Sequence, residues 1–511
     1  AKRSPERMAF MFRDKKFTYE KLNSVVNRAV HALQEMGLQK GDVLAIISQN
    51  CEHIAILMWA CFKAGIWYAP VNYLLRGGEI IYQLNHCGAK AFFVESAFLD
   101  PVKDVSDELK TVKTFGLINL ADVDLPKGWI DVEELFSEKY PDSEPDVIIN
   151  GEDPASIIYT SGTTSAPKGG LISNSSYFSQ TANFVTPLGA WMEESDIFLM
   201  NIPLFHIGAS SIFVAAAKTG ALCIATYGID PVEALELIQR EAVTGLVWPP
   251  TLYTGLLNLP LENYDLSSLR KCVWFGGTMP LDALKKWTEL CPGATFCGHW
   301  SQTEINVTGT FAWMRDKKMP SSGNIIGKPC IDTEIRIVDL NDEEVPTGDI
   351  GEIVLRSPSV MLGYYKDEEK TAETFRNGWH HTGDVGYQGK DGNYYFVDRV
   401  KDMVITGGEN VSCLDVEEVL NSHPDVQVTA VFGVHHPYWI EGVTAVVVPA
   451  SENLTEEDLL EYSQKNLAKY KIPKKFILIK YEDLPISPTG KILRKELRVT
   501  YKDIYKDVKS K

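Results

Sequence analysis

Residues 159–170 (YTSGTTSAPKGG) form the first segment whose side chains could do chemistry. Phosphate groups are bound by small hydroxyls, by a cation and by backbone N–H groups that glycine leaves accessible. This segment offers all three, and it is not a Walker A loop, because no Gly-Lys-Ser/Thr sequence opens a helix there. A solvated polar turn is the alternative, but Pro167 and Lys168 after the hydroxyl run favour a phosphate loop. Its expected binding residues are Thr160, Ser161, Gly162, Thr163, Thr164 and Lys168.

The composition narrows the choice of partner. The chain has 511 residues, 45% hydrophobic and 23% charged, and a formal net charge of −18. These are ordinary globular values, and the length fits roughly three domain-sized units. Nucleic acids and anionic membranes bind surfaces with a surplus of Lys and Arg, so the acidic balance argues against both. The acidic balance does not argue against ATP binding, because a few local donors can hold phosphates.

The cysteines and the most apolar segment indicate the compartment. Nine cysteines without CxxC pairs or metal-ligand spacing are typical of reduced thiols, so we expect a cytoplasmic protein. Residues 202–229 are the most apolar stretch, but they include His206, Lys218 and several glycines. We predict buried helix and strand there rather than a transmembrane segment, which needs about 20 clean apolar residues.

Short apolar runs alternate with helical patterns through the first part of the chain. Residues 43–48 are continuously apolar, as in a strand buried on both faces, and Thr18 can cap a helix that carries Val25, Ala29 and Leu33. Further strands are predicted at 91–94, 155–159, 196–200, 221–225, 245–247 and 272–275, and helices at 54–64, 231–241 and 281–290. This alternation predicts an α/β fold with mostly parallel sheets flanked by helices.

The pattern changes twice after residue 325. Residues 334–338 and 352–356 alternate apolar and polar side chains, which predicts a small antiparallel β unit. Beyond 398–402, helices at 413–422 and 455–467 and strands at 428–432 and 443–448 suggest a compact α+β domain. We therefore predict a large N-terminal domain at 1–398, divided at about 325 into an α/β part and a β-rich part, and a C-terminal domain at 399–511.

Many segments, in order along nearly the whole chain, resemble motifs of the adenylate-forming superfamily, which includes acyl-CoA synthetases, luciferases and peptide-synthetase adenylation domains. They are 17–22, 68–72, 159–170, 203–206, 276–278, 300–304 (WSQTE), 351–375, 379–384 (WHHTGD), 398–410 (DRVKDMVITGGEN) and 484–497. The resemblance implies two helix-flanked sheets, a β-barrel-like subdomain and a mobile C-terminal domain. It also implies that ATP activates a carboxylic acid as an acyl-adenylate, with release of pyrophosphate.

The same resemblance implies roles for individual residues. Glu304 would hold Mg²⁺ and Thr303 would donate to the α-phosphate. Asp384 would contact the ribose, and Arg399 the ribose or a phosphate. The adenine would lie beside Gly276, Gly277 and Thr278 and against the ring of Trp300, with His299, Ser301 and Gln302 alongside. Ser301 and Ser165 stand where the family commonly has Gly, and Gly170 where it commonly has Val.

Three segments are expected to act through a moving C-terminal domain. Lys491 would reach the α-phosphate and the substrate carboxylate during adenylation, as a mobile point charge can. Lys401 falls at the hinge position of the family. Gly407 and Gly408 would then line the approach of a pantetheine thiol.

His206 bears on the choice of acid. It stands where amino-acid-activating domains carry an Asp, and without that carboxylate a buried ammonium would be unpaired. We expect an aliphatic or aromatic acid in an apolar slot, with His206 gating the acyl tunnel and His299 offering a polar contact. CoA is the expected acceptor. The alternatives are an acyl-AMP ligase that loads a carrier protein and a non-catalytic acyl- or nucleotide-binding homologue; light emission is disfavoured and a homodimer is left open.

Overall fold

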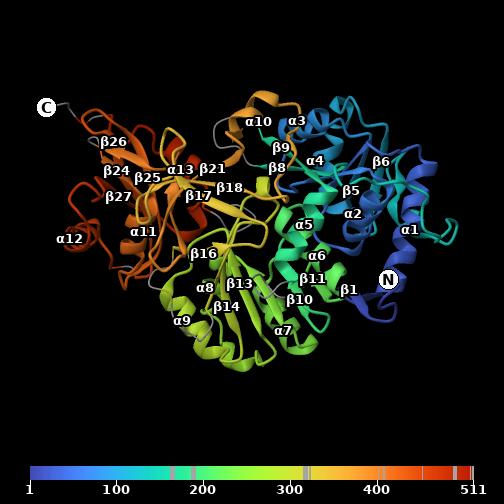
Figure 1. Cartoon of the computed structure of the whole chain (residues 1–511), viewed down its shortest axis with the longest axis horizontal. Coiled ribbons are helices and arrows are strands. Elements are labelled where there is room, and N and C mark those ends of the chain that lie inside the picture. The colour runs from blue at the N-terminus through green and yellow to red at the C-terminus, as the bar shows by residue number, and fades with distance from the viewer. Residues whose placement is uncertain are drawn as a thin grey trace.

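The computed structural model describes residues 1–160, 167–185, 192–314, 320, 324–400, 402–406, 409–451, 453–486, 492–506 and 508. Two large sheets occupy the chain up to about residue 400, and a third sheet lies in the remainder, at the opposite end of the molecule from the N-terminus (Figure 1). This arrangement confirms the predicted α/β architecture with a smaller C-terminal domain.

The first sheet is centred on β3 (Val43–Ile47), which pairs in parallel with β4 (Trp67–Val71) and β5 (Ala91–Glu95). Every residue of β3 and β5 is buried, as their continuous apolar runs predict. The strand order is β19-β9-β8-β4-β3-β5-β6-β7. The remaining strands are β6 (Thr114–Ile118), β7 (Ile130–Asp131), β8 (Pro154–Thr160), β9 (Lys168–Ser173) and β19 (Gly363–Tyr364).

Helices connect the strands of this first part. The helix predicted after Thr18 is α1 (Tyr19–Glu35), and the Thr18 hydroxyl accepts from the backbone N–H of Lys21 at 3.2 Å, as an N-cap does. The other helices are α2 (Glu52–Ala64), α3 (Gly78–Cys87), α4 (Leu99–Lys103) and the short 3₁₀ turns η1 (Ser96–Phe98), η2 (Ser106–Glu108) and η3 (Val132–Phe136).

The second sheet holds four predicted strands, β10 (Ile197–Met200), β11 (Leu222–Ala225), β12 (Gly245–Trp248) and β13 (Lys271–Phe275). It also contains β1 (Met8–Phe12) and β14 (Thr295–Trp300), which the sequence pattern did not predict, and β2 (Lys15–Thr18) at the edge. Their helices are α5 (Asn174–Val185), α6 (Ile207–Thr219), α7 (Pro231–Glu241), α8 (Pro250–Leu256), α9 (Leu281–Leu290) and the 3₁₀ turn η4 (Leu261–Asn263). Both α7 and α9 span the predicted residues.

The β-rich part continues the second sheet. Strand β16 (Ile325–Pro329) pairs with β15 (Thr310–Trp313) on one side and β22 (Tyr394–Arg399) on the other, so hydrogen bonds run without a break across the expected division at about 325. Beyond β22 the order is β21-β18-β17, and β20 pairs with β21. These elements are β17 (Glu334–Val338), β18 (Gly351–Arg356), β20 (Phe375–Arg376), β21 (Trp379–Gln388) and α10 (Glu368–Thr374).

The last sheet has the order β24-β23-β26-β25, with β27 beside β26. Its strands are β23 (Val404–Thr406), β24 (Glu409–Val411), β25 (Val426–His436), β26 (Ile440–Pro449) and β27 (Lys475–Leu478). Its helices are α11 (Cys413–Asn421), α12 (Glu456–Asn466), α13 (Arg494–Thr500) and the 3₁₀ turn η7 (Tyr481–Asp483). The division at 398/399 stays a prediction.

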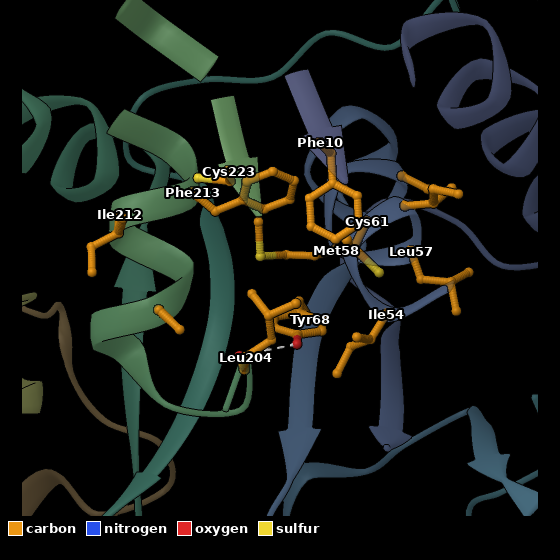
Figure 2. Close-up of a cluster of buried hydrophobic side chains, with 14 of the residues drawn as sticks. Phe10, Ile54, Leu57, Met58, Cys61, Tyr68, Leu204, Ile212, Phe213 and Cys223 are labelled. Carbon is orange, nitrogen blue, oxygen red and sulfur yellow. Dashed lines mark hydrogen bonds between the residues drawn. The ribbon is translucent and has the colours of Figure 1, made fainter. Parts of the chain in front are cut away.

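A core cluster joins the first two sheets through α2 and α6. Figure 2 shows aromatic and aliphatic side chains of both parts facing one another, and Phe10 and Phe213 lie with ring centroids 5.3 Å apart. Tyr68, fully buried, donates to the Leu204 carbonyl at 3.3 Å. The two sheets therefore share one packed interior, which fixes the relative positions of the strand ends they carry.

Residues 202–229 form α6, β11 and their connections, as predicted. Within the described part of the chain, no helix combines the length and the apolarity that crossing a membrane requires.

Candidate active site

Lys168, the lysine of the predicted phosphate loop, lies close to the side chain of Tyr364, which in turn contacts Glu304. Strand β9 begins at Lys168 and pairs with β19, where Tyr364 faces Gly170. The ammonium of Lys168 lies 5.3 Å from the centroid of the Tyr364 ring. The Tyr364 hydroxyl donates to Oε1 of Glu304 at 2.9 Å. One strand pair therefore brings the cation of the loop close to the candidate metal ligand.

Glu304 is positioned by its backbone as well as its side chain. It lies in the 3₁₀ turn η5 (Thr303–Ile305), directly after β14, and its carbonyl accepts from the N–H of Met361 at 2.8 Å. Burial, together with the neighbouring Glu304 carboxylate, raises the pKa of Tyr364 well above its ordinary value. Tyr364 therefore remains a neutral hydroxyl that can donate to Glu304 at any physiological pH.

A second group of residues surrounds Asp384, which is only 2% exposed. Its Oδ2 accepts from the indole N–H of Trp300 and from the side-chain amide of Gln302, each at 2.9 Å. Its Oδ1 lies 3.1 Å from Nε of Arg399. This carboxylate raises the pKa of Arg399, which stays a cation beside it. Asp384 is therefore a buried, oriented anion.

Sheet register explains how these residues meet. Asp384 on β21 is the cross-strand partner of Arg399 on β22, while Trp300 ends β14 and Gln302 follows it. Gly383 before the aspartate has a φ of +66°, and a Cβ there would meet nothing within 4 Å. The glycine thus permits a left-handed backbone and leaves space next to the carboxylate.

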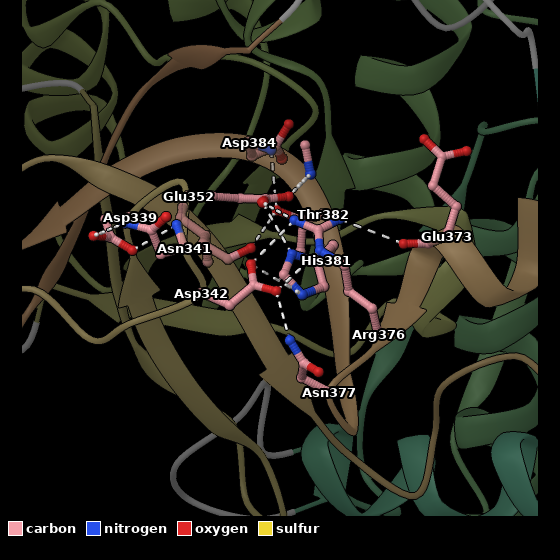
Figure 3. A network of polar contacts seen from close by, with 12 residues as sticks. Asp339, Asn341, Asp342, Glu352, Glu373, Arg376, Asn377, His381, Thr382 and Asp384 are labelled. Atoms are coloured by element: carbon pink, nitrogen blue, oxygen red, sulfur yellow. Dashed lines mark hydrogen bonds and ion pairs between the residues drawn. The ribbon is translucent and has the colours of Figure 1, made fainter.

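A polar network holds the β21 segment in this shape (Figure 3). Glu352 accepts from the backbone N–H of Gly383 through Oε1 and from the His381 ring through Oε2, each at 2.9 Å. The Thr382 hydroxyl donates to the Ile353 carbonyl at 2.6 Å and accepts from the N–H of Asp384 at 3.0 Å. The backbone that carries Asp384 is therefore held from the β18 side, which sequence motifs alone did not reveal.

His206 follows β10 and the glycine turn 276–278 follows β13, two parallel strands of the second sheet that are separated by β12. His206 caps α6, and its Nδ1 accepts from the N–H of Gly208 at 3.2 Å. Its ring lies 6.5 Å from that of Phe275, the last residue of β13. Gly276 and Gly277 follow as exposed residues, with Thr278 partly buried. These groups lie where the carboxyl ends of parallel strands meet, the usual place for a ligand in such a sheet.

His299 is buried, with 6% of its surface exposed, and stacks on Phe311 with ring centroids 4.4 Å apart. Its Nε2 has no hydrogen-bond partner among the described residues. Burial lowers the pKa of His299 to about 4, so the ring is neutral at pH 7. The next residue on β14 is Trp300, whose indole points to Asp384. Because successive residues of a strand face opposite sides, His299 faces away from that carboxylate.

The described structure brings together Lys168, Trp300, Gln302, Thr303, Glu304, Asp384 and Arg399. Thr160 lies at the end of β8, with its hydroxyl 3.5 Å from the Lys168 carbonyl, and the Ser301 hydroxyl donates to the Gln302 carbonyl at 3.3 Å. The predicted residues Ser161, Gly162, Thr163, Thr164, Lys401, Gly407, Gly408 and Lys491 lie outside the described residues.

Tyr364 is the functional candidate that sequence reasoning missed. It belongs to the matched segment 351–375, but nothing in the sequence pairs it with Glu304. The Gly363-Tyr364 pair inside a matched motif was the available signal, because Gly363 has a φ of +147° and a Cβ there would meet the Thr371 side chain at 2.7 Å.

Comparison with known proteins decides the family. The AMP-binding enzyme family matches residues 1–365, and its C-terminal domain matches residues 415–491. The chain belongs to the AMP-binding enzymes. The resemblance to adenylate-forming proteins inferred from the motifs is confirmed.

Relatives and solved structures of AMP-binding enzymes match over almost their whole length. A feruloyl-CoA synthase of Amycolatopsis sp is 31% identical over 98% of this chain and 96% of its own. The fatty acid–[acyl-carrier-protein] ligase ScoC of Streptomyces coeruleorubidus is 30% identical over 98% of this chain and 94% of its own. The structure of ATP-bound MatB from Rhodopseudomonas palustris superposes with a TM-score of 0.88 at 27% identity, covering 98% of this chain and 97% of that one.

Proposed function

We propose that this AMP-binding enzyme is an ATP-dependent acyl-CoA synthetase. A carboxylic acid and ATP would give an acyl-adenylate and pyrophosphate, and the thiol of CoA would then attack to give acyl-CoA and AMP. The observation that carries the proposal is that Lys168, Tyr364 and Glu304 form one group of contacts, and Trp300, Asp384 and Arg399 form a second, with both groups joined through the segment 300–304. One group suits phosphates and the other suits a ribose.

The adenylation half-reaction needs positioning and charge stabilisation more than a general base. Lys168 would hold the β- and γ-phosphates, and the Thr303 hydroxyl would donate to the α-phosphate. Asp384 would accept from the ribose hydroxyls, held in orientation by Trp300 and Gln302. Lys491 would supply a second cation at the α-phosphate and the attacking carboxylate.

The donors at Glu304 fit Mg²⁺. Among the described residues only Tyr364 donates to its carboxylate, and it uses Oε1, so the hard oxygen Oε2 is available for a cation. Bound there with the nucleotide phosphates, Mg²⁺ would neutralise charge on the leaving pyrophosphate.

The acid would be aliphatic or aromatic. His299 offers a second carboxylate on the substrate no positive charge, because burial lowers its pKa to about 4 and keeps the ring neutral at pH 7. His206 offers no anion for the ammonium of an amino acid. An acid without a second charge is therefore the best match to the described residues.

Transfer to a carrier protein is the second candidate, favoured by the 30% identity to the carrier-protein ligase ScoC. In either case the second half-reaction would follow rotation of the C-terminal domain at a hinge near Lys401, which would withdraw Lys491 and bring Gly407 and Gly408 to the thiol.

A panel of aliphatic and aromatic acids, with ATP and Mg²⁺, tests the proposal. Acid-dependent exchange of labelled pyrophosphate into ATP reports adenylation, and separate assays with CoA and with a holo carrier protein report thioester formation. Exchange with CoA thioester supports the synthetase, and exchange with carrier-bound product alone supports the second candidate. Absence of exchange with every acid would overturn both.

Lys491→Ala tests the division of labour. We expect adenylation to fall strongly while thioester formation from supplied acyl-adenylate is spared. Equal loss of both reactions would contradict the role assigned to Lys491.

A further inference from the structure

The first turn of α2 carries a cluster of side chains that the proposed reaction does not use. Cys51, Glu52 and His53 are consecutive, and a potential ligand atom from each lies within 4.8 Å of the others. All three are buried, with exposed fractions of 0%, 3% and 3%. In the described part of the chain, no other group of His, Cys, Asp or Glu has this metal-binding geometry.

One atom of the cluster is buried without the partner that such atoms normally have. Glu52 Oε2 has no hydrogen-bond partner among the described residues. His53 Nδ1 lies at ion-pair distance, 3.2 Å, from the other oxygen, Glu52 Oε1. Cys51 stands at the N-cap of α2, where its side chain makes no capping bond and its Sγ lies 3.5 Å from the Ser48 hydroxyl. A buried carboxylate oxygen without a donor is costly and calls for an explanation such as a bound ion.

The surroundings hold the cluster in the orientation that metal ligands have. Nε2 of His53 lies 2.8 Å from Oε2 of Glu133, a residue of η3 whose side chain is largely exposed. A metal-binding histidine typically bonds a carboxylate through one nitrogen and leaves the other for the ion. Lys15 of β2 pairs with Glu52 through Oε1, which leaves the buried Oε2 without a partner among the described residues.

The donor set selects a class of metal. A thiolate, an imidazole and one carboxylate suit a borderline-soft divalent ion with tetrahedral geometry, whereas Mg²⁺ and Ca²⁺ prefer oxygen ligands. Ligands around Zn²⁺ at about 2.0–2.3 Å lie roughly 3.5 Å apart, so the cluster would need to contract by about an ångström. The charges also balance, because the Cys51 thiolate, Glu52 and Glu133 would be offset by Lys15 and a divalent ion.

We propose that Cys51, Glu52 and His53 form a binding site for one Zn²⁺-like ion, with Glu133 orienting His53 and water as the fourth ligand. The site is structural. It would fasten the start of α2 to η3 and to the β1–β2 hairpin, three segments that meet at this turn. It is separate from the proposed Mg²⁺ position at Glu304, which lies at the end of β14.

Cobalt substitution tests the proposal in the full-length chain. After removal of metals with a chelator, titration with Co²⁺ should give one equivalent bound per chain and a thiolate-to-cobalt charge-transfer band in the near ultraviolet. Co²⁺ at Glu304 would give no such band, because that site has oxygen ligands. Zn²⁺ should abolish the band by displacement, and Mg²⁺ should leave it.

Matched variants identify the cysteine that gives the charge-transfer band. Cys51→Ala should lose it, whereas Cys61→Ala, a buried cysteine on the same helix, should keep it. Glu133→Gln should weaken Co²⁺ binding by about 10- to 100-fold while leaving the band, as loss of an orienting partner does. Zn²⁺ should raise the thermal unfolding midpoint of the wild type and of Cys61→Ala, but not of Cys51→Ala.

Three results would overturn the site. They are a wild-type chain without the charge-transfer band, a band of full intensity in Cys51→Ala, and an equal thermal shift by Zn²⁺ in wild type and Cys51→Ala. Circular dichroism and pyrophosphate exchange identify a variant that has not folded. If Cys51→Ala has not folded, the test rests on Glu133→Gln, which changes an exposed side chain. An unchanged Co²⁺ affinity in Glu133→Gln would contradict the proposal.

Discussion

Removing the indole N–H of Trp300 should weaken ATP binding through Asp384. Trp300 is 8% exposed and donates to Oδ2 of the buried Asp384 at 2.9 Å. Trp300→Phe keeps an aromatic ring and deletes only this donor and part of the ring volume. A hydrogen bond to a charged group contributes about 1.5–3 kcal/mol.

The remaining partners of Asp384 reduce this figure. Oδ2 keeps the amide of Gln302, and Oδ1 keeps Arg399. We therefore take the lower part of the range, about 1.5–2 kcal/mol, which corresponds to about a 10- to 30-fold change in an equilibrium constant. In Trp300→Phe the KM for ATP in pyrophosphate exchange should rise by at most this factor, because the free protein also makes this bond and only its part in orienting Asp384 counts towards binding.

The preference for ATP over a ribose-modified nucleotide distinguishes a loss of Asp384 positioning from a general loss of structure. If Trp300 orients Asp384 towards the ribose hydroxyls, the variant should lose part of the preference for ATP over 3′-deoxy-ATP. Trp59→Phe is the matched control, because the Trp59 indole nitrogen has no hydrogen-bond partner among the described residues. Unchanged KM for ATP and unchanged preference in Trp300→Phe would refute the reasoning, provided that urea unfolding shows a folded protein.

Three further changes have defined outcomes. Tyr364→Phe removes the donor to Glu304, so the Mg²⁺ concentration needed for half-maximal exchange should rise severalfold, and no rise would exclude a positioning role. Arg494→Leu leaves the buried Glu417 carboxylate without its guanidinium, so urea unfolding should show a loss of about 3–5 kcal/mol; a loss below 1 kcal/mol would contradict this. Burial lowers the pKa of His299 from 6.5 to about 4, so between these values the unfolded chain binds a proton that the folded chain does not. Stability should therefore fall as pH drops from about 6.5 to about 4, and His299→Gln should remove about 3 kcal/mol of that fall in urea titrations at each pH.

The sequence predicted the repeating strands and helices well, because their patterns are local. Residues 231–241 became α7 because Asp230 caps the helix and Pro231 suits its first turn, both visible in sequence. Likewise the apolar run at 43–48 became the fully buried β3. Family motifs then supplied Glu304, Asp384 and Arg399 as candidates.

Contacts between distant segments could not be predicted in this way. Nothing in the local pattern pairs Tyr364 with Glu304, or directs the Trp300 indole to Asp384 rather than to a ligand alone. The join of β16 to β22 depends on the register of strands far apart in the chain. The expected division at about 325 rests on a change in pattern and stays a prediction, and such a change does not show that a sheet continues through it.

The pairing of β9 with β19 has a consequence for synthesis on the ribosome. Lys168 is synthesised long before its neighbour Tyr364, and Asp384 and Arg399, the proposed ribose contacts, follow later still on β21 and β22. A nascent chain that stops short of β22 carries the predicted phosphate loop but lacks Arg399. If these residues bind nucleotide as proposed, nucleotide would not stabilise the first sheet while it folds, and its effect would begin only when the N-terminal domain is almost fully translated. Truncated products should accordingly gain no protection from ATP against proteolysis.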